Sequence, residues 1–252
     1  MVRVTRSSEL REAWIAVRGR LVRTIARSFP PSVKSILEVG SGSGEITVPL
    51  ATSFPDVAIT AVDPFKGPYS RDRVKLLAGL NRVGAGRRVR VITRNAVPWV
   101  SRSRADRFDV VLSSEFLPEI DTAQMQRFFH GCYRLLRPGG TTAHLFLSPN
   151  PSRPRQILVI EADSDSRWTV HPPRAWFSPP PARVVEALAS ARFRDARAHH
   201  YAGGLVARGE AARTLLTQWG VRTSFARTYA HRLSKEGLEL PDWIVAVGTK
   251  PG

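Results

Sequence analysis

The fold is decided by the stretch Ile36-Leu37-Glu38-Val39-Gly40-Ser41-Gly42-Ser43-Gly44-Glu45-Ile46-Thr47. It reads as a short apolar strand that ends in an acid and runs into a glycine-rich turn, after which a helix opens. Glycine permits positive φ angles and lets a ligand approach the backbone closely. A strand, a glycine turn and a helix in this order are typical of ligand-binding α/β sheets.

A dinucleotide site is the obvious competitor for such a turn. Its G-x-G-x-x-G pattern requires glycine at position 45 and holds a pyrophosphate at the helix N-terminus, but position 45 is Glu45. A carboxylate there would repel a pyrophosphate, whereas a ligand that carries an ammonium and a sulfonium tolerates nearby acids. The turn therefore favours a cationic ligand over a dinucleotide.

With Glu38, Gly40, Gly42 and Gly44 in place, the stretch resembles the first motif of the class I, Rossmann-like S-adenosylmethionine-dependent methyltransferases. That motif is an acid, any residue, then G-x-G-x-G. The resemblance implies S-adenosyl-L-methionine as the cofactor, with these four residues and Ser41 in its binding site. A glycine-rich loop without a ligand is the alternative.

A second acid, Asp63, closes the next apolar strand and is followed by Pro64. This is the distance at which such folds place a carboxylate on ribose hydroxyls, so we expect Asp63 and Pro64 at the cofactor. An aspartate at a strand end is otherwise a cap or turn residue. Phe65 would lie against the adenine or belong to the core.

After the third strand the resemblance implies an acid that bonds the adenine amino group, but the sequence reads Asn95 and Ala96. An asparagine can still accept that bond through its carbonyl oxygen. Both residues are therefore expected at the adenine.

The turn after the fourth strand carries Ser113, Ser114 and Glu115, which the resemblance places beside the reactive methyl group. The two serines are candidate cofactor contacts, and Glu115 is a candidate general base if it is partly buried. Capping of the next helix, or exposure to solvent, is the alternative for Glu115. The turn lacks the N/D-P-P-Y/F tetrapeptide, and Cys132 lies in an expected helix, which argues against amide, base-amine and cysteine-dependent cytosine methylation.

Two histidines are informative. His171 lies in an aromatic, proline-stiffened loop that could roof a substrate pocket, and it is a second candidate catalytic residue; an ordered surface loop is the alternative. His144 lies in an expected strand and is interpreted as a satisfied core or rim residue. We expect no metal site, because no acids, histidines and cysteines have ligand spacing.

The expected fold is an α/β, Rossmann-like, mostly parallel seven-stranded sheet with helices on both faces. An amphipathic N-terminal helix within residues 1–33 would act as a lid or pack on the sheet, and the methyltransferase domain would span 34–252. Within that domain we expect a proline-rich loop region at 148–181 and a helical insertion at 204–238, before the last strand. The expected strands are Ser35–Val39, Val57–Val62, Val89–Ile92, Val110–Leu112, Thr141–Leu147, Phe193–His200 and Trp243–Val247. The expected helices are Ser8–Ser28, Thr122–Leu136, Pro181–Ala191, Ala207–Trp219 and Ser224–Glu236; Gln156–Ala162 fits either type.

Composition limits the class of protein. The 252 residues include one cysteine, which excludes an internal disulfide or a two-cysteine redox cycle. No apolar run reaches the roughly 18 residues that cross a bilayer, and we expect a cytoplasmic protein with no membrane span and no cleaved signal. The net charge of +17 would attract nucleic acid, anionic membrane or an acidic substrate; a solvated basic surface is the alternative. Oligomeric state is left open.

Three functions fit the sequence. The first is methylation of a small-molecule acceptor, with the N-terminal helix and the inserted helices as a lid. The second is RNA methylation, with arginines of Arg71–Arg107 and of the N-terminal segment on the RNA backbone. The third is a non-catalytic protein that keeps only the fold.

Overall fold

The computed structural model describes residues 1–66, 70–151, 153–167 and 178–252. The chain divides into two compact units. The sheet unit comprises Arg18–Phe146, Pro179–His199 and Ile244–Gly252, and the accessory unit comprises Met1–Val17, Leu147–Ser178 and His200–Trp243.

A seven-stranded sheet forms the sheet unit, in the order β4-β3-β2-β5-β6-β10-β7. The pairs β2 with β3, β3 with β4, β2 with β5 and β5 with β6 are parallel, which confirms the expected mostly parallel sheet. Its strands are β2 (Ser35–Val39), β3 (Ala58–Asp63), β4 (Val89–Thr93), β5 (Phe108–Ser114), β6 (Leu136–Leu147), β7 (Arg194–Tyr201) and β10 (Trp243–Thr249).

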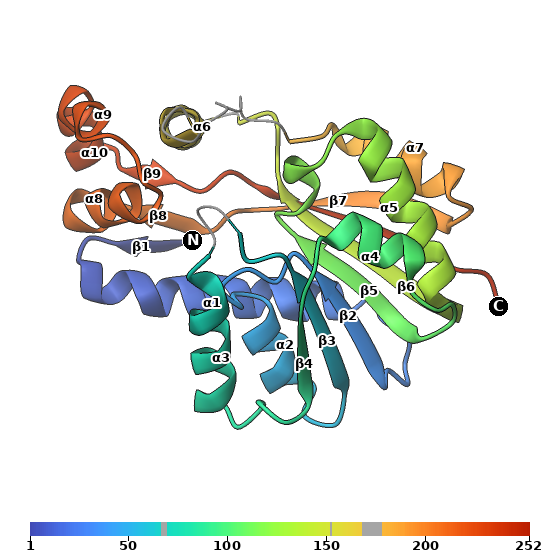
Figure 1. Cartoon of the computed structure of the whole chain (residues 1–252). Coiled ribbons are helices and arrows are strands. Elements are labelled where there is room, and N and C mark those ends of the chain that lie inside the picture. The colour runs from blue at the N-terminus through green and yellow to red at the C-terminus, as the bar shows by residue number, and fades with distance from the viewer. Residues whose placement is uncertain (67–69, 152, 168–177) are drawn as a thin grey trace. The chain divides into compact units, whose positions relative to one another are not determined.

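Helices cover both faces of this sheet (Figure 1). On one face lie α4 (Ala96–Arg102), α5 (Thr122–Leu135) and α7 (Pro181–Ser190), whose apolar side chains share one core with the strands. On the other lie α2 (Thr47–Ser53) and α3 (Asp72–Arg82). The central strands β2, β3, β5 and β10 are mostly buried, which is why they read as apolar runs rather than alternating ones, whereas the outer strands β4 and β7 are largely exposed or partly buried.

The start of α5 shows how local sequence sets an element boundary. The Asp121 side chain accepts a hydrogen bond from the Gln124 backbone N–H at 2.7 Å, and the Gln124 side chain accepts one from the Asp121 N–H at 2.9 Å. This reciprocal capping satisfies two donors that have no partner inside the helix.

The strand order reverses between β2 and β5. The chain winds outward from β2 through β3 to β4, and then returns to place β5 on the other side of β2. The turns that follow β2 and β5 therefore diverge from neighbouring carboxyl ends, which is where open α/β sheets bind ligands.

The accessory unit contains elements that the sequence did not reveal. Three short strands, β1 (Val2–Val4), β8 (Leu205–Ala207) and β9 (Leu238–Glu239), form a second sheet in which β1 is parallel to β8 and β8 is antiparallel to β9. The expected helical insertion at 204–238 thus begins and ends in strands, and the N-terminal segment 1–33 begins with one. Strands of two or three residues are too short to produce an alternating pattern.

Two helical segments differ in detail from the sequence prediction. Within the proline-rich region 148–181, the segment Gln156–Ala162, which the sequence left open between strand and helix, lies in the helix α6 (Pro154–Arg167); Pro154 is tolerated in the first turn, where its missing N–H costs nothing. The single helix expected at Ser224–Glu236 is instead α9 (Thr223–Thr228) and α10 (Ala230–Lys235), separated at Tyr229. The remaining helices, α1 (Ser7–Ala26) and α8 (Gly209–Gln218), lie close to their expected positions.

Ionic contacts hold α6 to the C-terminal part of the accessory unit. Arg153 binds Glu239 at 2.6 Å and Asp242 at 3.0 Å, and Arg155 reaches Glu239 at 3.3 Å. Glu239 is buried, and the two arginines offset the cost of burying its carboxylate.

The contact between α4 and α5 can be tested at Gly131. A Cβ atom there would lie 2.6 Å from Val100 Cγ1 and 3.2 Å from the Val100 carbonyl carbon. We expect Gly131→Ala to lower the free energy of unfolding, because overpacking costs about 1–3 kcal/mol and exceeds the helix preference of alanine, about 1 kcal/mol. Urea unfolding measures this. Gln126→Ala, on the exposed face of α5, is the control, and a Gly131→Ala protein as stable as the native one would contradict the close packing.

Candidate cofactor site

The turn after β2 adopts a conformation that only its glycines permit comfortably. Gly40, Gly42 and Gly44 have φ angles of +76°, +45° and +86°. The Gly44 N–H donates to the Ser41 carbonyl at 2.9 Å, and the Gly44 carbonyl accepts from Val48 N–H at 2.9 Å to begin the helix. The strand, turn and helix predicted from the sequence are therefore present.

Packing constrains two of these glycines and leaves the third open. A Cβ at Gly44 would lie 2.6 Å from Leu76 Cδ1, and one at Gly40 would lie 3.1 Å from Phe116 Cβ. Among the residues that the structure describes, a Cβ at Gly42 would meet nothing closer than an Asp72 oxygen at 4.0 Å. The space over Gly42 is thus available to a ligand.

Asp63 connects the end of β3 to the turn. Its Oδ2 accepts a hydrogen bond from Gly42 N–H at 3.0 Å, and its Oδ1 accepts one from Phe65 N–H at 2.7 Å. The side chain is buried. Each carboxylate oxygen can accept a second bond, so Asp63 fixes the turn and still has acceptor capacity. Phe65 is also buried, with a φ of +47°.

Glu38 is a buried acid at the end of β2, 1% exposed. Burial raises its pKa to about 8; a hydrogen bond with Thr47 lowers the pKa in part, and the nearby Asp63 charge raises it. Among the described residues nothing hydrogen-bonds Glu38 Oε2 or the buried Ser41 hydroxyl. Buried polar atoms normally have partners, so these two are available to accept a hydrogen bond from a ligand or to donate one to it.

The end of β5 contains a buried polar network. Thr142 Oγ1 donates to the Val111 carbonyl at 3.1 Å and lies 2.7 Å from His144 Nε2, while His144 Nδ1 lies 2.8 Å from Ser113 Oγ. The threonine proton is committed to Val111, so His144 Nε2–H donates to threonine and Nδ1 accepts from serine. Burial lowers the pKa of His144 to about 3, which keeps it neutral.

His144 is thus the satisfied core residue that the sequence predicted. The Ser113 hydroxyl is fully buried and bonded to His144, so the side chain positions the strand end, and a contact of Ser113 with the cofactor stays a prediction. A serine at a strand end has the same sequence signature in either role.

Residues 37–142, which contain the glycine turn, Asp63 and the end of β5, match the family model described as a methyltransferase domain. Residues 37–142 are thus similar to methyltransferase domains, and the sheet has the Rossmann-like fold of the class I S-adenosylmethionine-dependent methyltransferases.

A curated relative, the demethylmenaquinone methyltransferase of Roseiflexus castenholzii, is 28% identical over 198 residues, covering 71% of this chain and 75% of the relative. The solved S-adenosylmethionine-dependent methyltransferase SibL is 18% identical with a TM-score of 0.59, covering 96% of this chain and 57% of that protein. The Haemonchus contortus phosphoethanolamine N-methyltransferase 2, solved with phosphomonomethylethanolamine and S-adenosylhomocysteine, is 16% identical with a TM-score of 0.61, covering 92% and 53%. The chain spans little more than half of the two solved proteins, and at such identity the likeness shows the fold.

The donor set of the turn fits S-adenosylmethionine. The ligand carries an ammonium and a sulfonium, and the turn offers the partly protonated Glu38 and the open face of Gly42. A cation beside Glu38 would favour its ionised form. The buried acid that is costly without a ligand therefore becomes a favourable partner when the ligand is bound.

The glycine turn has a further charged contact that the sequence did not single out. Arg18 of α1 is buried and binds Glu45 at 2.7 Å, at the residue that follows Gly44. The acid that argued against a dinucleotide thus anchors α1 to the turn. In the sequence, Arg18 is one of several arginines at helical spacing, and nothing there separates it from the exposed ones.

Three other residues were expected at the site, and for these the structure shows fewer contacts. Glu115 has a φ of +56° and is half-buried, and its N–H donates to the Leu145 carbonyl at 2.9 Å. Asn95 precedes α4 and is exposed, and its side chain makes no capping bond with the helix. His171 lies outside the described residues.

The residues that the structure describes contain no group of three or more histidine, cysteine, aspartate or glutamate side chains able to hold a metal ion. None of their helices combines the length and the apolar character that crossing a bilayer requires.

The glycine turn predicts different outcomes for two alanine substitutions. Gly44→Ala combines a left-handed backbone, about 1–2 kcal/mol, with a clash against Leu76, and should lower the free energy of unfolding strongly. Gly42→Ala carries only the backbone cost, but its methyl group enters the open space and should weaken S-adenosylmethionine binding at least tenfold. Urea unfolding and calorimetry measure the two effects. Equal cofactor affinity in Gly42→Ala and the native protein would remove that space from the site.

Glu38 predicts a pH dependence of stability. The folded protein keeps the Glu38 proton up to a pH of about 8, whereas the unfolded chain releases it near 4.5. The folded state therefore binds more protons between these values, and this group makes stability fall as pH rises from about 4.5 to 8. Glu38→Gln cannot ionise, so its melting temperature should gain on the native value as pH rises.

The exposed Glu12→Gln variant is the control for the loss of one charge. Melting curves of the three proteins between pH 5 and 9 give the comparison. Parallel profiles for the native and Glu38→Gln proteins would show that Glu38 ionises normally in the fold.

Proposed function

We propose that this chain transfers the methyl group of S-adenosylmethionine to a small-molecule acceptor. The observation that carries the proposal is the extent of similarity to a relative named for a small acceptor, demethylmenaquinone, which covers 71% of this chain and 75% of that protein. The phosphoethanolamine enzyme, named for a different small acceptor, adds support through its fold. The acceptor class is therefore inferred from relatives, and the cofactor from the site.

We place the methionine part of the cofactor over the glycine turn, with its ammonium toward Glu38. Asp63, which holds the turn through Gly42, would accept the ribose hydroxyls with its remaining lone pairs. Asn95 would accept from the adenine amino group. Gly40, Ser41, Gly44, Pro64, Ala96 and Ser114 complete the proposed site.

Bound S-adenosylmethionine supplies an electrophilic methyl group. The protein's part is to align the acceptor for an in-line displacement and to exclude water, since positioning alone accounts for a large share of such a barrier. An acceptor that attacks through a hydroxyl or a ring carbon must also lose a proton. Glu115 is the proposed base, because its strained, half-buried position follows the end of β5.

The first test separates cofactor from acceptor. Calorimetric titration should show micromolar binding of S-adenosylmethionine and none of NAD. Formation of S-adenosylhomocysteine is then followed with reduced naphthoquinones, phenols and small amines, and with total RNA. We expect turnover with a small molecule that is insensitive to the presence of RNA.

Other outcomes identify the alternatives. Methylation of RNA, with an affinity that falls steeply with added salt, would replace the small-molecule proposal; the charge of +17 is its support. Binding of neither cofactor would make the non-catalytic interpretation the leading one.

A further inference from the structure

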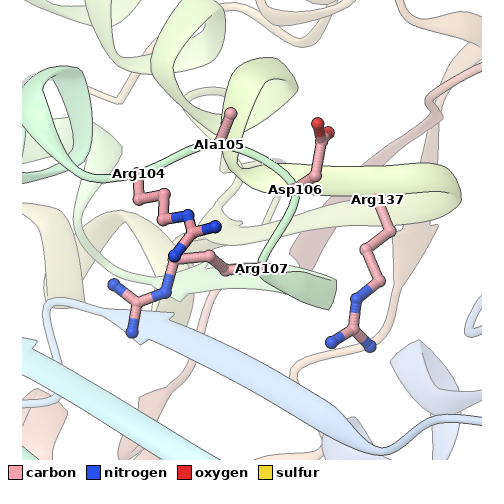
Figure 2. Close-up of a pocket in the computed structure, with 5 residues that line it drawn as sticks. All are labelled: Arg104, Ala105, Asp106, Arg107 and Arg137. Carbon is pink, nitrogen blue, oxygen red and sulfur yellow. The ribbon is translucent and has the colours of Figure 1, made fainter.

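A hollow of about 480 Å³ lies where β5 begins, lined by Arg104, Ala105, Asp106, Arg107 and Arg137 (Figure 2). The glycine turn follows the carboxyl end of β2, whereas this hollow adjoins the amino end of β5, which runs parallel to β2. The hollow therefore lies at the amino ends of the strands, opposite to the carboxyl ends where the cofactor site is proposed.

The acids around this hollow already have cationic or N–H partners. Asp106 binds the Lys250 ammonium at 2.7 Å. Asp109 accepts from the backbone N–H groups of Lys34 and Ser35 at 2.9 and 2.8 Å, and from Arg137 at 2.9 Å. Burial would raise the pKa of Asp109, but these hydrogen bonds outweigh it and lower the pKa. Both carboxylates are thus committed.

Arg104 and Arg107 have no acidic partner among the described residues. Figure 2 shows their guanidinium groups side by side, with Arg137 across the hollow and the Asp106 carboxylate pointing away. The Arg107 guanidinium lies 5.5 Å from the centre of the Phe108 ring. With Lys250 included, four cations face two carboxylates here, and neighbouring like charges repel.

The loop that presents these arginines is held in place. Asp106 N–H donates to the Arg134 carbonyl at 3.0 Å, and Arg107 N–H donates to the Leu135 carbonyl at 2.8 Å. The Arg134 side chain in turn donates to the Ser103 carbonyl and, at 2.9 Å, to that of Val100. The backbone that carries the two arginines is therefore held before any ligand arrives, which reduces the entropy lost on binding.

We propose that this hollow is a binding site for a phosphate-bearing anion, separate from the methyl-transfer site. Guanidinium groups present paired N–H donors that match phosphate oxygens. A pyrophosphate or phosphate ester between Arg104, Arg107 and Arg137 would neutralise the uncompensated charge. The phosphate can come from a soluble ester or from a phospholipid headgroup.

The test uses the full-length protein with sodium tripolyphosphate as probe. Calorimetry should show saturable binding, and Arg104→Ala/Arg107→Ala should weaken it at least tenfold. The matched control is Arg82→Ala/Arg87→Ala, which removes two exposed arginines elsewhere on the sheet unit and should change the affinity less than twofold. Binding of S-adenosylmethionine should be the same in all three proteins, which shows that each is folded and that the cofactor site is separate.

Sedimentation with vesicles identifies the source of the phosphate. Loss of binding to phosphatidylglycerol vesicles in the Arg104/Arg107 variant, but not in the control, assigns a headgroup; binding of tripolyphosphate without vesicle binding assigns a soluble ester. Equal weakening in both double variants would mean a diffuse basic surface and would overturn the proposal, as would the absence of tripolyphosphate binding.

Discussion

The hydrogen bond from Gly42 N–H to Asp63 is the contact on which the rest of the site depends. It joins the turn after β2 to the end of β3, two segments that parallel strands bring together at one edge. Leu76 and Phe116 then press on the turn from either side, where only glycine leaves room for them. The α/β sheet brings the carboxyl ends of the strands together. This one hydrogen bond and its two packing contacts then give the turn after β2 the shape that a ligand needs.

Three acids, Glu38, Asp63 and Glu45, lie at or near the glycine turn, and each is accommodated there in a different way. Glu38 is buried and holds its proton, Asp63 is occupied by backbone donors, and Glu45 is paired with Arg18. Each carboxylate is therefore neutralised or satisfied by a different means. Behind them, Phe116 packs on Phe128 and Phe128 on His144, with ring centres 5.0 and 5.4 Å apart. The aromatic contacts link the turn to the polar network at the end of β5.

The sequence predicted the fold and the cofactor correctly where a residue type has only one physical role. Three glycines spaced by two and an acid at each strand end specified the turn, the first strands and the cofactor class. Prediction was incomplete where one pattern serves two roles: Ser113 at a strand end can bond the core, as its contact with His144 shows, or a ligand, and Gln156–Ala162, which fits either a strand or a helix by periodicity, lies in α6. Arg18 was indistinguishable from its neighbours because burial depends on tertiary packing, and β1, β8 and β9 are too short to leave a period.

The way in which the accessory unit is assembled has an evolutionary consequence. It is built from three separate stretches of chain, and within it strands of two or three residues and the arginine contacts of Glu239 and Asp242 join these stretches. Insertions and substitutions in these stretches leave the register of the seven-stranded sheet untouched. The accessory unit can therefore change in sequence while the glycine turn and Asp63, which both lie in the sheet unit, are inherited unchanged.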